Sequence, residues 1–192
     1  LRTVIASTHL PAEERQAAAV RLLRKDLTRA RYSDFLGDLA LAEALGPNDF
    51  SAPSRAVDSV GYDCPTLVES VRILEKAPDS ARALNCLADY FREYTDHGYE
   101  PLRPDLLGGS PDRFGGRDRS SLDLYRHVID NPKAGDDDRA YALHRALRCF
   151  ATSGGNHCDD QDIAKAQRKR WFTLLKTRYG KTSWGRAQRV YW

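Results

Sequence analysis

Hydrophobic residues along this chain recur three or four positions apart, which is the spacing of one face of an α-helix. The sequence shows no sustained alternation of hydrophobic and polar residues, the pattern typical of a half-buried strand. It therefore predicts an all-α protein. In the first helix, for example, the apolar stripe is Val20, Leu23, Leu27 and Ala30. We expect about eight helices, beginning near Pro11, Ser33, Pro65, Ser80, Ser121, Asp136, Asp160 and Ser183.

Proline and glycine residues separate these helices. Gly46-Pro47 ends the second helix, Asn131-Pro132 ends the fifth, and Gly180 follows the seventh. Most connections are short, which is typical of antiparallel helix hairpins, and each hairpin leaves an apolar face for the next one to cover. We therefore expect a single domain over 1–192, an α-solenoid of stacked antiparallel helix hairpins. A long loop rich in Gly, Pro and Arg interrupts it at 96–120.

Composition limits the possibilities without naming a function. The chain has 192 residues, of which 41% are hydrophobic, so it can bury a sizeable core and is not disordered throughout. No apolar run approaches the ~20 residues of a membrane helix, and we expect no membrane span. The net charge of +3 is too small to indicate nucleic-acid binding by itself. Because the first residue is Leu1 rather than Met, we expect a processed protein or a domain cut from a longer chain.

The four cysteines are an even number, which is compatible with two disulfides. Cys149 and Cys158 enclose a turn-rich segment after a predicted helix, so we expect a disulfide there, with Cys64 and Cys86 as the remaining pair. Two disulfides would place the protein in an oxidising compartment such as a periplasm. The alternative is a cytosolic protein with buried free thiols. No C-x-x-C pair is present, which argues against zinc-ribbon and thioredoxin-like sites.

The C-terminal helices carry a family resemblance. Its residues are Ala164, Trp171, Leu174, Leu175, Tyr179, Ser183, Trp184 and Ala187. This spacing resembles the tetratricopeptide-like repeats of bacterial envelope proteins, in which a proline stands where this chain has Gly180. The stretches 139–143 and 39–45 are similar to further repeat helices. The resemblance implies a concave surface that binds or scaffolds other proteins, often in the periplasm, and it implies no catalytic residue.

Positive charge is concentrated near the C-terminus. Between Gln161 and Trp192 nine residues are basic and only Asp162 is acidic, with six aromatic residues among them. One interpretation is a surface for an acidic partner or another anion. Its candidate residues are Lys165, Arg168, Lys169 and Arg178, with Arg113 and Arg117 in the long loop. The alternative is that the aromatic residues form the packed face and the basic residues an ordinary solvated face.

The remaining patterns do not amount to a site for chemistry. The segment from His157 to Asp160 contains metal-ligating side chains, but adjacent residues rarely converge on one ion. His144 lies five positions before Cys149, and on a helix the two point away from each other. The glycines at 108–116 lack the Lys-Ser/Thr ending and the preceding strand of a phosphate-binding loop. We therefore predict no metal, no cofactor and no catalytic residue.

These features together predict a non-enzymatic domain of an exported bacterial protein that binds or scaffolds another protein. Two alternatives stay open. One is an accessory α-superhelical domain of an envelope enzyme that processes peptidoglycan, with its catalytic residues outside this segment. The other is binding of nucleic acid or another polyanion through the basic C-terminal helices.

Overall fold

The computed structural model describes residues 1–46, 50, 61–94, 114–152, 158 and 163–192. Within these ranges the chain forms nine helices and no strand, which confirms the predicted all-α class. The helices are α1 (Arg2–Ile5), α2 (Ala12–Thr28), α3 (Tyr32–Glu43), α4 (Leu67–Lys76), α5 (Ala81–Tyr94), α6 (Ser121–Asp130), α7 (Asp136–Arg148), α8 (Lys165–Arg178) and α9 (Ser183–Ala187). None of these helices is long and apolar enough to span a membrane.

Helix boundaries follow the sequence signals closely, with three exceptions. α2 ends at Thr28, so Ala30 is not part of its apolar stripe but takes a left-handed backbone (φ 57°) after the helix. α8 begins at Lys165 rather than near Asp160, because Ile163 and Ala164 are not helical; Asp160 itself lies outside the described residues.

The third exception is the last helix, which ends at Ala187 rather than Trp192. Gln188 takes an extended backbone (φ −77°, ψ 107°), and its side-chain amide donates to the carbonyl oxygen of Val190 at 2.6 Å. This local bond holds the final residues in a non-helical conformation, as polar side chains that bond to nearby backbone often do.

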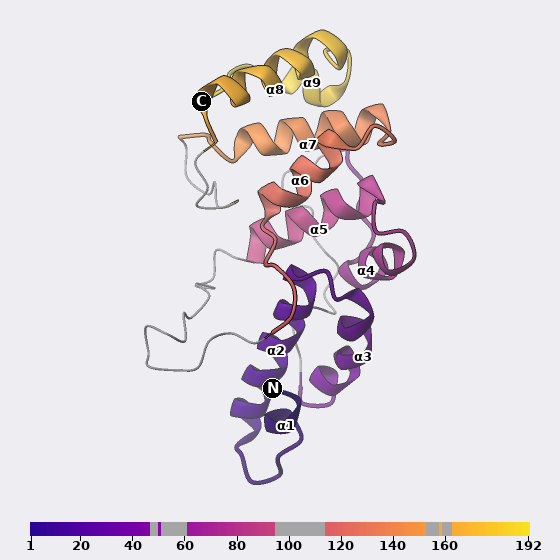
Figure 1. Ribbon diagram of the computed structural model, residues 1–192, viewed down its shortest axis with the longest axis vertical. Coiled ribbons are helices and arrows are strands. Elements are labelled where there is room, and N and C mark those ends of the chain that lie inside the picture. Colours follow the sequence, from indigo (N-terminus) through magenta and orange to yellow (C-terminus); the bar gives the residue numbers. More distant parts are fainter. Residues whose placement is uncertain (47–49, 51–60, 95–113, 153–157, 159–162) are drawn as a thin grey trace.

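The helices pack in the order in which they occur in the chain. Each helix contacts the next one, and in addition α5 contacts α7 and α7 contacts α9. Figure 1 shows the resulting arrangement: α1, α2 and α3 lie at one end of an elongated molecule, and α8 and α9 lie at the other. Contact mainly between neighbours is what stacked helix hairpins produce.

One apolar core runs through the stack, and its burial is greatest in the middle. α7 has eight buried residues, among them the charged Arg139 and Arg145. In contrast α8, which has one more residue than α7, buries only Trp171 and Leu175. The open side of α8 is therefore available at this end of the stack (Figure 1).

Capping boxes fix the starts of α4 and α6. The Thr66 hydroxyl accepts from the backbone N–H of Glu69 at 3.2 Å, and the Glu69 carboxylate accepts from the Thr66 N–H at 3.0 Å. Ser120 and Asp123 make the same pair of bonds at the start of α6. Each box satisfies two backbone N–H groups that the helix leaves unpaired.

The predicted loop at 96–120 lies outside the described residues as far as residue 113. Its described part, from Phe114 to Ser120, is not helical and lies along the end of α2. The backbone N–H of Arg119 donates to the carbonyl oxygen of Thr28 at 2.8 Å. This segment therefore connects the corner between α2 and α3 to the start of α6.

Candidate functional site

The exposed side of α8 carries basic residues without acidic partners. Lys165 and Lys169 are exposed, and in the described ranges no carboxylate forms an ion pair with either. Arg170 is also exposed and donates to Gln167 Oε1 of the same helix at 3.0 Å. We refer to Lys165, Lys169 and Arg170 as the α8 basic patch. Two of its members were candidates from the sequence.

The other basic residues predicted on α8 are engaged within the molecule. The Arg168 guanidinium lies 4.8 Å from the centre of the Phe150 ring, and Arg178 pairs with Asp136 at 3.4 Å. Trp171 is buried, as the packing interpretation of the aromatic residues predicts. The packing interpretation is therefore confirmed for Trp171, and the interpretation as a surface for an acidic partner stays a prediction.

The two candidates from the long loop do not join this patch. Arg113 lies outside the described residues. Arg117 pairs with Asp123 at 2.9 Å beside the start of α6, and its side chain is 74% exposed. It therefore has an acidic neighbour of its own, unlike the α8 basic patch.

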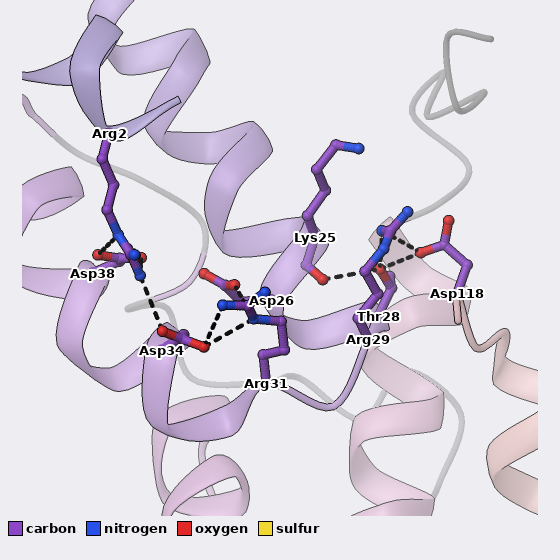
Figure 2. A network of polar contacts seen from close by, with 9 residues as sticks. All are labelled: Arg2, Lys25, Asp26, Thr28, Arg29, Arg31, Asp34, Asp38 and Asp118. Atoms are coloured by element: carbon purple, nitrogen blue, oxygen red, sulfur yellow. Dashed lines mark hydrogen bonds and ion pairs between the residues drawn. The ribbon is translucent and has the colours of Figure 1, made fainter. Parts of the chain in front are cut away.

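A network of ion pairs joins α1, α2 and α3 at the opposite end of the molecule (Figure 2). Arg2 Nη2 pairs with Asp38 at 2.7 Å and with Asp34 at 3.1 Å. Arg31, in the turn between α2 and α3, pairs with Asp34 at 2.7 Å. Arg2 therefore holds the short helix α1 against α3.

Asp26 is the least compensated acid of this network. Its side chain is fully buried, neither carboxylate oxygen has a hydrogen-bond partner, and its ion-pair contact is Arg31 Nε at 3.5 Å. Burial raises its pKa to about 7, and the charges of Asp38 and Asp34 add to this, while Arg31 opposes it. A carboxyl group with such a pKa suits acid–base catalysis, but burial keeps this one from any substrate.

A second buried network joins α5, α6 and α7. Asp89 accepts hydrogen bonds from the hydroxyls of Tyr125 and Tyr141, and from Arg145 Nε at 2.8 Å. Burial, with the charge of Asp89, raises the pKa of both tyrosines, so each hydroxyl keeps its proton and donates it. The carboxylate is thus paired and hydrogen-bonded inside the stack, which is the arrangement of a structural ion pair.

His144 has no nucleophile to activate. Burial lowers its pKa to about 4, with Arg145 and Arg148 contributing, so the imidazole is neutral near pH 7. Cys149, the one cysteine near it in sequence, forms a disulfide with Cys158. The sequence-based rejection of a His144–Cys149 catalytic pair is therefore consistent with the structure.

Both predicted disulfides are present. Cys149–Cys158 has a Cα–Cα separation of 5.5 Å, and Cys64–Cys86 has one of 5.6 Å. The second disulfide ties the segment before α4 to α5. Beside it, the Tyr62 ring stacks on Tyr141 with 3.6 Å between ring centres.

Metal-ligating side chains do not converge in the described ranges. No group of three or more His, Cys, Asp or Glu side chains there is placed to hold an ion. His157, Asp159 and Asp160, which the sequence singles out, lie outside those ranges.

Comparison of the chain with protein-family models, with curated proteins and with solved structures finds no match.

Sequence reasoning missed the buried acids Asp26, Asp38 and Asp89. A signal was present for one of them: Asp26 lies three and four residues after Leu23 and Leu22, on the buried face of α2. The opposite charges that accompany Asp38 and Asp89 come from other helices, and linear spacing carries no information about such contacts.

Proposed function

We propose that this chain is a non-enzymatic protein-binding domain whose α8 basic patch docks an acidic surface of another protein. The observation that carries the proposal is the end position of α8. α8 buries two residues, and the three side chains of its basic patch are exposed, with no carboxylate paired with them among the described residues. Complementary charge across an interface speeds association and selects partners.

The buried charged groups in the rest of the described chain support a binding role rather than catalysis. The acids with perturbed surroundings, Asp26 and Asp89, are buried in networks that join helices. The histidine of lowered pKa, His144, is buried, and Cys149, the cysteine near it in sequence, is held in a disulfide. A stack of helices with a charged end fits a scaffold, as the tetratricopeptide resemblance also implies.

We also propose that the domain works outside the cytosol, in an oxidising compartment such as the bacterial periplasm. Two disulfides in a chain of this size fit that environment, because reducing systems keep cytosolic thiols free. Mass mapping of the protein isolated from its native location should find Cys64–Cys86 and Cys149–Cys158. Four free thiols would contradict export.

The docking proposal is tested by placing a photo-crosslinking amino acid at position 169 in the source cells. We expect discrete adducts with an acidic protein, and their loss when Lys165→Glu and Arg170→Glu are combined with the crosslinker. The matched control carries the crosslinker at Arg72, an exposed basic position on α4, with Lys76→Glu as its charge reversal. The same adducts from both positions would contradict a specific surface.

Binding to a polyanion gives a different result in solution. Duplex DNA or anionic vesicles would bind with an affinity that falls steeply with salt, and charge reversal on α8 would lower the slope. Such binding, without protein adducts at position 169, would replace the proposed function by the polyanion alternative.

A further inference from the structure

A cavity of about 320 Å³ opens at the corner between α2 and α3, against the end of α4. Its apolar wall includes Leu74 and Pro78, and its polar wall includes Tyr32, Glu75 and Arg119. The volume is that of a small-molecule site, and such sites combine apolar walls with a few convergent polar groups. The cavity lies where the corner between α2 and α3 meets α4, away from the end of the molecule that α8 and α9 form (Figure 1).

Arg119 presents a fixed positive charge in this cavity. Its backbone N–H donates to Thr28, its Nη2 donates to the Tyr32 hydroxyl, and its guanidinium lies 5.8 Å from the centre of the Tyr32 ring. Its Nε is buried without a hydrogen-bond partner. In the part of the chain that the structure describes, no carboxylate forms an ion pair with Arg119.

Two acids close to Arg119, Asp118 in the sequence and Asp34 in the cavity wall, are already engaged. Asp118 accepts from Thr28 Oγ1 at 2.6 Å and from Arg29 Nη1 at 2.7 Å (Figure 2). Asp34, which also lines the cavity, accepts from Arg31 and Arg2. Neither of these two acids therefore neutralises the charge of Arg119.

Two further groups in the wall complement a ligand with two charges. The Tyr32 hydroxyl accepts from Arg119, and burial raises its pKa, so it keeps a proton to donate. Glu75 is exposed and, within the described ranges, has no cation paired with it. The wall thus offers donors for a carboxylate and an acceptor for an ammonium group.

The geometry points to a binding site for a zwitterion, an amino acid or a short peptide with free ends. Its carboxylate pairs with the Arg119 guanidinium and accepts from the Tyr32 hydroxyl, and its ammonium group donates to Glu75. Arginine is suited to this role because its planar donors match a carboxylate. The exposed apolar surface of Pro78 receives the side chain.

Calorimetric titration with alanyl-alanine tests the site, with free alanine as a second arm that separates a peptide from an amino acid. We expect binding to weaken about tenfold or more in Arg119→Gln, the loss typical of a charged hydrogen bond. Amidation of the peptide's C-terminus should weaken binding to the parent protein by a similar factor. The same amidation should weaken binding to Arg119→Gln little further. N-acetylation should weaken binding in the parent but not in Glu75→Gln.

Arg117→Gln is the matched control, because Arg117 lies two residues away and pairs with Asp123 at the surface. It should bind as the parent does. Glu75 is exposed, so Glu75→Gln keeps the test valid even where Arg119→Gln disturbs the corner. Absence of binding by both ligands, equal binding by Arg119→Gln in its folded form, or equally tight binding of inorganic phosphate would overturn the zwitterion site.

Discussion

At the scale of single residues, Asp26 makes stability depend on pH in an unusual direction. Its pKa is about 7 in the folded chain and near 3.8 when unfolded, so between these values the native state holds a proton that the unfolded state has released. The contribution of Asp26 to the free energy of unfolding is therefore most favourable at or below pH 4 and is lost as the pH rises toward 7. Above pH 7 the loss is complete.

We predict that Asp26→Asn becomes more stable than the parent as the pH rises. The difference in free energy of unfolding should grow from small near pH 4.5 to about 2–4 kcal/mol at pH 8. Urea unfolding followed by circular dichroism measures it. Asp34→Asn is the control of opposite sign, because Arg31 and Arg2 lower the pKa of Asp34 and its stabilisation is present above its unfolded pKa. A pH-independent difference for Asp26→Asn would show that the carboxyl is not destabilised by burial.

Ala30 carries backbone strain that a glycine would relieve. It has φ 57°, and the bonds Ala30 N–H to Leu27 and Arg31 N–H to Asp26 (2.8 Å) form a Schellman motif that usually places glycine here. We predict that Ala30→Gly raises the melting temperature, with a gain of up to about 1 kcal/mol. Ala17→Gly, at an exposed position inside α2, should lose about as much. Destabilisation by both substitutions would contradict the strain.

At the scale of helices, the sequence predicted most boundaries because local chemistry decides them. The capping residue Ser120 starts α6, and the acids at 136–138 start α7. The prediction was wrong at the end of α9, where the Gln188 side-chain amide bonds to the Val190 carbonyl two residues on; the helical spacing of Trp184, Ala187 and Tyr191 does not reveal this local bond. Gly180 was expected only to follow a helix end; a side chain there would place its Cβ 2.4 Å from the Lys176 carbonyl oxygen, so close approach requires the glycine.

The Cys64–Cys86 disulfide fixes one element against another, and its loss should cost more than the loss of Cys149–Cys158. The two close loops of 22 and 9 residues, for which chain entropy gives about 3.4 and 2.6 kcal/mol. We predict that Cys64→Ser with Cys86→Ser lowers the denaturant midpoint more than the other double substitution does. Equal or reversed losses would show that loop entropy does not govern these bonds.

At the scale of the whole molecule, the predicted stacking of hairpins agrees with contacts that join mainly successive helices. The two proposed sites differ in how far the sequence predicted them. The spacing of basic residues along the chain indicated the α8 basic patch, since two of its three residues were candidates. The corner cavity was not predicted, because α2, α3, α4 and the segment at 114–120 meet only in the folded chain. Residues from four separate segments form this cavity, so no regular spacing in the sequence indicates it.

Because each helix packs mainly on its neighbours, a substitution that destabilises α5, α6 and α7 should lower hydrogen-exchange protection unevenly along the stack. In Asp89→Asn, Arg145 is left buried without a full counter-charge, which costs about 3–5 kcal/mol when a buried pair is broken. We expect hydrogen exchange to increase throughout α5, α6 and α7, and in α8 and α9, which pack on α7. α1, α2 and α3 pack mainly on each other, so their amides should keep more of their protection.

Hydrogen exchange followed by mass spectrometry resolves these regions in one experiment. Asp79→Asn is the matched control, because Asp79 is exposed and its contact is a surface bond to His127 at 2.9 Å. It should leave exchange unchanged outside that contact. If Asp89→Asn instead lowers protection equally from α2 to α9, the chain unfolds as one cooperative unit. In that case the helices do not unfold separately in the order in which they pack, and the two proposed sites are energetically coupled through the core.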